Sequence, residues 1–528
     1  MRCELDIAMP SQDTSYTNNL DLREDIPMRT WIVAAWIAAL SCTARPASAQ
    51  VTLPSLWADH AVVQRDQPVR VWGRAAAGEH VTVRFRGNSA AVAADEFGQW
   101  HMELPPGVAG GPFAMELEGS NRITLNDLMV GDVWVASGQS NMEFTTRNVI
   151  HADAELQKAN YPNIRLFHVQ KISADYPQYD VKATSWTAVT PQSVADFSAV
   201  AYFFATEVQA DQKVPIGLIE ADWGGTPAET WTSQRALSAD GSLMAAWSTW
   251  ADMTEKQQQT ELIIQHEARE SAEALAAGKP EPQHSYHPEL RSWLPGGTFN
   301  GMIAPLTQFA VRGVIWYQGE SNARIDRSFY YARLFRTMIE DWRSRWAEGD
   351  FPFLFVQLAN FETAPDAKWP ELRDAQRRTL SIVNTAMASA IDIGTPKDIH
   401  PKNKQEVGHR LALAARAIAY HENLEYSGPL FDSVMSDGPI MRVFFSHTSR
   451  GLEVRGSTLT GFEVAGADGV FAAATARVDG NTVVASAPAA PHPQQVRYGW
   501  AANPACNLYN GAGLPASPFT TSGPDPGR

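Results

Sequence analysis

The sequence predicts an α/β protein whose parallel sheet is covered by helices on both faces, with β-rich segments at both ends of the chain. Between residues 129 and 423, short apolar runs typical of fully buried strands alternate with helical stretches. Residues 50–128 and 424–528 instead show the alternation of apolar and polar residues that half-buried strands have. With 528 residues, the chain is also long enough for more than one domain.

Residues 28–49 have the pattern of a targeting segment. Met28 and an arginine precede an apolar run from Trp31 to Leu40, and small residues end at Ala49, as in a secretory signal. The run is shorter than the roughly 20 residues that span a bilayer. We expect a secreted or periplasmic protein cleaved after Ala49, with Met28 as the true start and residues 1–27 as an extension from a wrongly chosen start codon. A lipoprotein carrying its lipid on Cys42 is the less favoured alternative.

Composition excludes several classes of function. A formal net charge of −15 argues against binding nucleic acid, whose phosphates require Lys and Arg. Cleavage after Ala49 leaves Cys506 as the single cysteine, so neither an internal disulfide nor a cysteine-based zinc site is expected. The 17 Trp and 13 Tyr are compatible with a sugar-binding surface, although core packing is the better explanation for any single aromatic residue.

The expected domains follow the change in pattern along the chain. Residues 50–128 form an N-terminal β domain, 129–423 form the α/β domain, and 424–528 form a C-terminal β segment. We expect the two terminal segments to combine into one β-sandwich domain, since each is short. A polar, helix-prone stretch at 232–296 interrupts the α/β rhythm and is interpreted as a helical insertion. The expected strands of the parallel sheet cover 130–136, 163–169, 214–220, 311–316, 351–357 and 385–391.

Polar loops follow four of these strands, at the edge of a parallel sheet where ligands usually bind. Ser140, Gly225, Asn322 and His400 lie in these loops, in that order along the chain. A serine hydroxyl, open backbone N–H groups, a side-chain amide and an imidazole together can act as nucleophile, oxyanion site and base. Each residue alone has a simpler explanation, such as a helix cap for Ser140 or a tight turn for Gly225. Their combination favours a hydrolase.

The order Ser, Gly, Asn, His is the signature of the SGNH hydrolases. The blocks GQSNMEF, GGTPAETW, WYQGESNA and DIHPKNKQEVGHRLAL resemble those of the sialate O-acetylesterase family and its acetylxylan-esterase relatives. Segments near both ends, such as LPSLWADH and VRYGW, are similar too, so the resemblance spans the chain after residue 49. It implies an SGNH three-layer sandwich and a serine esterase that removes O-acetyl groups from carbohydrates.

The resemblance also implies a role for each block. Ser140 attacks the acetyl carbonyl, and His400 takes its proton and passes it to the leaving sugar hydroxyl. The backbone N–H groups of Ser140 and Gly225 and the side chain of Asn322 hold the oxyanion. No cofactor or metal is implied, and the expected partner is an acetylated carbohydrate. The sugar stays open between sialic acid, xylan and xyloglucan, and the oligomeric state stays open as well.

The acid behind His400 departs from the usual Asp-x-x-His pattern, because position 397 is a lysine. Asp398 stands two residues before the histidine, and residues i and i+2 of an extended segment face the same side. We therefore expect Asp398 to orient the ring. Asp392, or a serine–histidine dyad without an acid, are the alternatives.

Four further residues are weaker candidates for binding substrate. Gln139, Gln318 and Glu320 can bind sugar hydroxyls or merely support their loops, and Trp223 can line a pocket or pack in the core. Two other functions compete with the esterase. One is a glycan-binding protein with a vestigial hydrolase site, and the other is an SGNH lipase or thioesterase.

Overall fold

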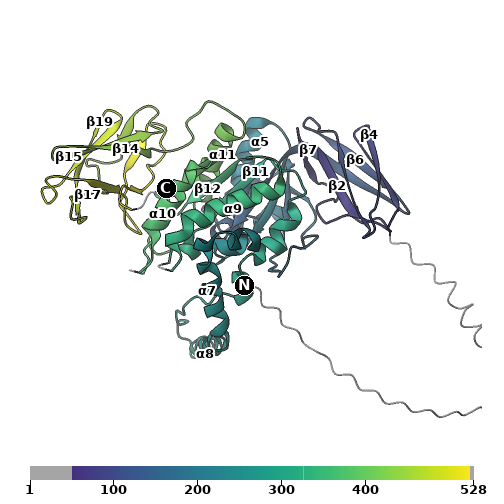
Figure 1. The fold of residues 1–528 in the computed structure, drawn as a ribbon, viewed down its shortest axis with the longest axis horizontal. Coiled ribbons are helices and arrows are strands. Elements are labelled where there is room, and N and C mark those ends of the chain that lie inside the picture. The colour runs from purple at the N-terminus through teal and green to yellow at the C-terminus, as the bar shows by residue number, and fades with distance from the viewer. Residues whose placement is uncertain (1–49, 325, 365, 524–528) are drawn as a thin grey trace, which may run out of the picture. The chain divides into compact units, whose positions relative to one another are not determined.

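The structure is a computed structural model that describes residues 50–324, 326–364 and 366–523 (Figure 1). These residues belong to one compact unit that begins at Gln50. The secretory signal expected at residues 28–49, the extension expected at 1–27 and the alternative lipidation site at Cys42 all lie outside the described residues. Among the residues that are described, no helix combines the length and apolar character needed to cross a membrane.

The predicted parallel sheet forms, with strand order β13-β12-β11-β7-β10-β8-β9. All of its neighbouring strands are parallel except β9, which is antiparallel to β8. Every apolar run predicted for this sheet overlaps one of its strands. The bounds are β7 (Arg122–Gly138), β8 (Tyr161–His168), β9 (Thr187–Val189), β10 (Ile216–Asp222), β11 (Gly313–Tyr317), β12 (Phe353–Gln357) and β13 (Thr385–Ser389).

Helices cover both faces of this sheet, as predicted. Trp134 of β7 packs on Phe204, 5.0 Å between ring centroids, and so faces α5 and its neighbour α11. Trp316 of β11 packs on Trp342 at 5.9 Å and faces α9. Because Trp134 lies opposite Gly313, the residue three positions before Trp316, the two indoles point to opposite faces. The helices are α2 (Ser140–Glu143), α3 (Ala152–Lys158), α4 (Pro191–Ala195), α5 (Ala199–Gln212), α9 (Tyr331–Trp346), α10 (Trp369–Arg378) and α11 (Lys404–Ile418).

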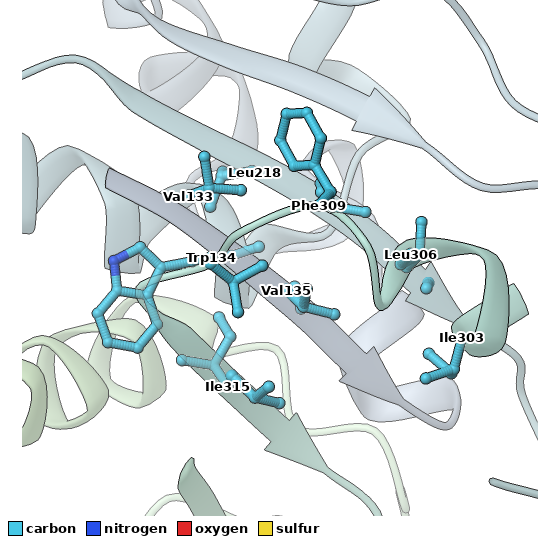
Figure 2. Close-up of a cluster of buried hydrophobic side chains, with 14 of the residues drawn as sticks. Val133, Trp134, Val135, Leu218, Ile303, Leu306, Phe309 and Ile315 are labelled. Carbon is cyan, nitrogen blue, oxygen red and sulfur yellow. The ribbon is translucent and has the colours of Figure 1, made fainter. Parts of the chain in front are cut away.

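Figure 2 shows part of the resulting core around β7 and its two neighbouring strands. By strand register, Leu218 of β10 and Ile315 of β11 lie on the same face of the sheet as Trp134, whereas Val133 and Val135 lie on the other face. Phe309, from the segment before β11, packs in the same buried cluster. These side chains are almost completely excluded from water. The apolar runs are therefore buried on both faces, which is why they lack the alternation of half-buried strands.

Strand β7 belongs to two parts of the fold at once. Its first half pairs antiparallel with β6, from Arg122 to Val130. Its second half, from Asp132 to Gly138, pairs in parallel with β10 and in part with β11. The boundary expected between residues 128 and 129 thus falls inside one continuous strand. The pattern changes there because the strand passes from a half-exposed position to a fully buried one.

The two terminal β regions are separate, which corrects the expectation of one β domain built from both ends. Within the part of the chain that the structure describes, the N-terminal strands pair only with one another or with β7, and their side chains join the main core. Among the described residues, the C-terminal strands pair only with one another and enclose a core of their own. The N-terminal strands are β1 (Val62–Gln64), β2 (Val69–Arg74), β3 (His80–Phe85), β4 (Asn88–Ala93), β5 (Gln99–Leu104) and β6 (Gly110–Glu118). The C-terminal strands are β14 (Leu430–Asp437), β15 (Ile440–Ser446), β16 (Leu452–Val454), β17 (Phe462–Ala465), β18 (Phe471–Ala473), β19 (Thr475–Asp479), β20 (Thr482–Ser486), β21 (Gln495–Tyr498), β22 (Leu508–Asn510) and β23 (Phe519–Thr520).

The insertion at 232–296 is helical and contains α6 (Gln234–Ser238), α7 (Ala245–Glu255) and α8 (Gln257–Ala276). Helices α7 and α8 project from the α/β domain (Figure 1), and no residue of α8 is buried. The following proline-rich segment returns along α8, where His287 bonds to Glu267 at 3.2 Å. The α7–α8 part of the insertion is therefore an exposed arm, whereas Leu237 and Leu243 before it join the main core.

Candidate active site

The predicted site loops meet at the middle of the parallel sheet. Strand β7 is central, with β10 on one side and β11 on the other, and the chain reverses its direction of travel across the sheet at β7. This switch point opens a crevice at the carboxyl ends of the three strands. The loop after β13, at the edge of the sheet, reaches the same place because the side-chain amide of Asn141 donates to the carbonyl oxygen of Ile399 at 3.0 Å.

Ser140 and His400 are in direct contact. The Oγ of Ser140 lies 2.8 Å from Nε2 of His400. Ser140 is the first residue of α2, whose N-cap position is held by Gln139 without a side-chain capping bond. The serine hydroxyl is therefore not spent on capping the helix, which was its simpler explanation. Gly138 permits the tight turn that precedes Ser140. Its φ is +143°, and a Cβ at this position would lie 2.1 Å from the carbonyl oxygen of Tyr317.

The surroundings of His400 favour its neutral form. Its ring is partly buried and stacks on Phe144, with 6.4 Å between ring centroids. Burial lowers the pKa of His400 below its usual 6.5, and the nearby positive charge of Lys404 lowers it further. The carboxylates of Asp398 and Glu143 act in the opposite direction but do not outweigh these effects. At neutral pH the imidazole is thus ready to accept a proton from Ser140.

Asp398 lies beside His400 but does not hold its ring by a hydrogen bond. Its Oδ1 accepts the backbone N–H of His400 at 2.9 Å, whereas the ring Nδ1 is 4.0 Å from the same oxygen. That separation exceeds hydrogen-bonding distance, so the carboxylate acts on the ring through its charge. The alternative acid, Asp392, accepts two bonds from Arg410, at 2.7 and 3.0 Å, and one from Tyr509 at 3.2 Å. Asp392 is therefore engaged away from the ring.

The C-terminal β region helps to hold the segment that leads to His400. Tyr509 reaches Asp392 from β22, as described above. Arg373 of α10 is fully buried, and its guanidinium donates to the carbonyl oxygens of Ala501 and Ala502, both at 2.8 Å. Asn360 also bonds to Asn503 at 2.8 Å and accepts the N–H of Gly394 at 2.9 Å. The segment from 392 onward is thus fastened from both domains.

The loop after β10 that contains Gly224 and Gly225, called here the glycine loop, lies next to Ser140. A Cβ on Gly224 would lie 3.3 Å from that of Ser140, and the N–H of Gly224 donates to Glu143 at 2.6 Å. Gly225 has a φ of +76°, and its carbonyl oxygen accepts the indole N–H of Trp293 at 2.9 Å. The Trp293 bond fixes the orientation of this peptide from the insertion side.

Asn322 is placed behind this loop. It is completely buried, its amide nitrogen donates to Glu229 at 2.8 Å, and its oxygen accepts the N–H of Ala228 at 2.9 Å. It does not line the cavity that holds Ser140. The side-chain amide that the sequence assigned to the oxyanion site is thus bonded to Glu229 and Ala228, outside the residues that line the cavity.

The four weaker candidates divide into two groups. Gln318 is completely buried and bonds to Asn322 and to the hydroxyl of Tyr331, which makes it part of the same buried network. Gln139, Glu320 and Trp223 line the cavity. Of these, Gln139 accepts the N–H of Ser321 at 3.2 Å through its side-chain oxygen.

The cavity has a volume of about 1080 Å³ and contains both Ser140 and His400. One wall comes from the insertion and another from the loops after β7 and β11. Four cationic and four anionic side chains line it, so its net charge does not select for an anionic ligand. The charged residues are Lys171, Lys256, Arg324, Arg327, Glu143, Asp252, Glu320 and Asp326, and the insertion adds Thr249, Met253, Gln257, Thr260, Tyr286, His287, Pro288 and Trp293.

Known proteins share both the sequence and this architecture. The family model for sialic acid-specific acetylesterases, a group of carbohydrate esterases, matches residues 288–417. The sialate O-acetylesterase of Mus musculus is 34% identical over 400 residues, covering 68% of this chain and 72% of the relative. The chain belongs to the sialate O-acetylesterase family. The Homo sapiens member is 32% identical over 403 residues, covering 69% of this chain and 70% of its own.

A solved structure supports the assignment of the fold within the sialate O-acetylesterase family. A carbohydrate acetylesterase from Xanthomonas citri is 39% identical and superposes with a TM-score of 0.78, covering 90% of this chain and all of the other. The α/β domain of this family member is thus the SGNH fold that the sequence blocks predicted.

Sequence reasoning missed three residues of the site. Asn141 and Phe144 belong to the GQSNMEF block, so their position in a matched motif was an available signal. Lys404 gave none, because a lysine at the start of an amphipathic helix is usually exposed. In this member of the sialate O-acetylesterase family it is completely buried beneath the site.

Proposed function

We propose that the protein is a serine esterase that removes O-acetyl groups from carbohydrates. The observation that carries the proposal is the contact of 2.8 Å between Ser140 Oγ and His400 Nε2 inside a large cavity. The names of its relatives, sialate O-acetylesterase and carbohydrate acetylesterase, agree with this chemistry.

In the proposed reaction, Ser140 attacks the acetyl carbonyl while His400 takes the hydroxyl proton. The bond between the acetyl carbon and the sugar oxygen then breaks, and His400 gives its proton to that oxygen, which leaves as a sugar hydroxyl. Water, activated by the same imidazole, attacks the acetyl-serine and releases acetate. We assign the oxyanion to the backbone N–H groups of Ser140 and Gly225. The third donor expected from the sequence, the Asn322 side chain, is bonded to Glu229 and Ala228, and we assign it instead the task of fixing the glycine loop.

The glycine loop gives a first test. We expect Gly225→Ala to lower kcat/KM on p-nitrophenyl acetate by about 10²-fold or more, the usual cost of losing one oxyanion donor. Alanine is strained at a φ of +76°, and its Cβ would lie 2.0 Å from the hydroxyl of Tyr286. The peptide must therefore shift, which moves its N–H away from the proposed oxyanion position. Gly241→Ala is the control, because nothing lies within 4 Å of its Cβ position. Equal kinetics in the two variants would argue against Gly225 as a donor.

We further propose that the substrate is an acetylated oligosaccharide or polysaccharide. The cavity is larger than a single sugar ring requires, and its outer wall is the polar start of α8 with the end of α7. Gln257 and Thr260 lie on this wall and can bond to sugar hydroxyls beyond the acetylated residue.

The double variant Gln257→Ala/Thr260→Ala is expected to lose about tenfold in kcat/KM on acetylated xylan or xyloglucan, because two hydrogen bonds are lost. It should keep wild-type activity on p-nitrophenyl acetate, which does not reach this wall. Gln259→Ala, on the same helix but outside the cavity lining, is the matched control. If the double variant changed kcat/KM relative to wild type by the same factor on the polymer and on the small ester, this role of the insertion would be contradicted.

A panel of acetylated sialosides, xylan and xyloglucan identifies the sugar by acetate release. Binding of these glycans without release of acetate would contradict the esterase, and preference for octanoyl over acetyl esters would indicate a lipase. We also propose that the protein is secreted or periplasmic, on the basis of the signal pattern that ends at Ala49.

A further inference from the structure

A completely buried lysine lies directly beneath the site. Lys404 is the first residue of α11, four positions after His400, and its side chain is excluded from water. Its ammonium group lies over the rings of Phe144 and Tyr317, at 4.8 and 5.2 Å from their centroids. Burial of a cation at the N-terminus of a helix is unfavourable, because water is lost and the helix dipole opposes the charge. Such a residue needs compensating contacts.

Asn141 provides one of these contacts and connects Lys404 to the site. The ammonium group of Lys404 donates to the Oδ1 of Asn141. The amide nitrogen of Asn141 then points the other way and donates to Glu320 at 2.5 Å and to the carbonyl oxygen of Ile399 at 3.0 Å. Asn141 directly follows Ser140, and Ile399 directly precedes His400. The lysine thus fixes an amide that ties the serine loop to the histidine loop.

Glu320 supplies the opposite charge. Its Oε1 is bonded to Asn141, while its Oε2 is buried without a hydrogen-bond partner among the described residues. Burial raises the pKa of Glu320 and lowers that of Lys404 to about 7, and each group partly offsets the shift of the other. We call Lys404, Asn141 and Glu320 the Lys404 cluster. An apolar trio of similar volume would be less costly to bury.

We propose that Lys404 is a positioning residue that holds Ser140 against His400 through Asn141 and keeps the imidazole in its proton-accepting form through its charge. The proposal rests on the esterase function proposed above.

The charged groups that act on His400 come from three elements. Lys404 of α11 opposes its protonation, whereas Asp398 of its own loop and Glu143 of α2 favour it. Glu143 is itself paired with Lys171 at 2.5 Å. Loss of the lysine charge removes one of the two effects that lower the pKa of His400, burial being the other, so the ring takes up its proton at higher pH than in the wild type. Loss of the Asp398 charge has the opposite effect.

The test is the pH dependence of kcat/KM on p-nitrophenyl acetate, whose acid limb reports protonation of the free enzyme's base. In Lys404→Gln, which keeps a donor for Asn141 but no charge, the acid limb should move to higher pH by about half a unit or more. In Asp398→Asn the acid limb should move to lower pH by a similar amount, because the negative charge that favours protonation of His400 is lost. The asparagine oxygen can still accept the backbone N–H of His400, so the loop should keep its conformation. Lys402→Met, an exposed lysine two residues away, should leave the profile unchanged.

Thermal unfolding of each variant checks that it is folded, and Lys404→Met provides a second neutral variant if the glutamine variant is unstable. A folded neutral variant whose acid limb stays at the wild-type pH overturns the proposal, even if its turnover falls. Absence of acetate release by the wild-type enzyme would instead contradict the proposed function, so the two failures are distinct.

Discussion

Ser140→Ala is expected to lower kcat for acetate release by about 10⁴-fold or more, with the fold unchanged. The hydroxyl that lies 2.8 Å from His400 is the proposed nucleophile, and among the described residues no second hydroxyl is bonded to that ring. Alanine leaves the oxyanion donors and the cavity in place, so binding of an acetylated glycan should persist. The measurement is single-substrate kinetics on p-nitrophenyl acetate, followed by acetate release from acetylated xylan.

Ser137→Ala is the matched control for this variant. Ser137 lies three residues earlier, and its hydroxyl donates to the carbonyl oxygen of Ala221 at 2.6 Å, away from His400. This control should keep a turnover close to wild type. Wild-type turnover in purified Ser140→Ala would rule out the proposed nucleophile.

His400→Gln is expected to lower kcat by about 10³-fold or more, because His400 is the one described side chain bonded to Ser140 Oγ and able to take its proton. Asp398→Asn should cost less than about tenfold at neutral pH, in contrast to an acid that orients the base through a ring hydrogen bond. The reason is geometric: Asp398 bonds to the backbone N–H of His400, and its oxygen stays 4.0 Å from the ring. Both variants are compared with wild type in kcat at neutral pH on the same ester.

An equal loss in the two variants would show that the carboxylate closes on the ring when substrate binds. Asp392→Asn separates the two acids. It should act mainly on thermal stability, since Asp392 is bonded to Arg410 and Tyr509 rather than to the site.

The sequence was sufficient to predict which loops meet. Apolar runs defined the strands of the sheet, and in a parallel sheet their carboxyl ends share one edge, so the Ser140 and His400 loops could be assigned to one site. Their contact in the structure agrees with that prediction. The helical character of the insertion also followed from its local composition.

Side-chain orientation could not be predicted in the same way, because it depends on partners distant in sequence. The orientation of the Asn322 side chain is set by its bond to Glu229, which lies 93 residues earlier in the chain. Asp398 accepts the backbone N–H of His400, a donor that any residue except proline would provide at position 400. The prediction that the two terminal β regions form one domain was wrong for a related reason. Strand alternation identifies a buried face but not the strand that lies beside it, so β7 could not be recognised as the partner of β6.

The length of β7 has a consequence for how the molecule comes apart. One hydrogen-bonded strand runs from Arg122 to Gly138, and the loop that carries Ser140 is its direct continuation. The N-terminal β region therefore has no hinge through which it can detach, and it should melt together with the catalytic domain as one cooperative unit. The C-terminal region, with its own core, can open separately. Inactivation by heat can then begin at the end of the chain that fastens the histidine loop, while the serine loop is still held by the sheet.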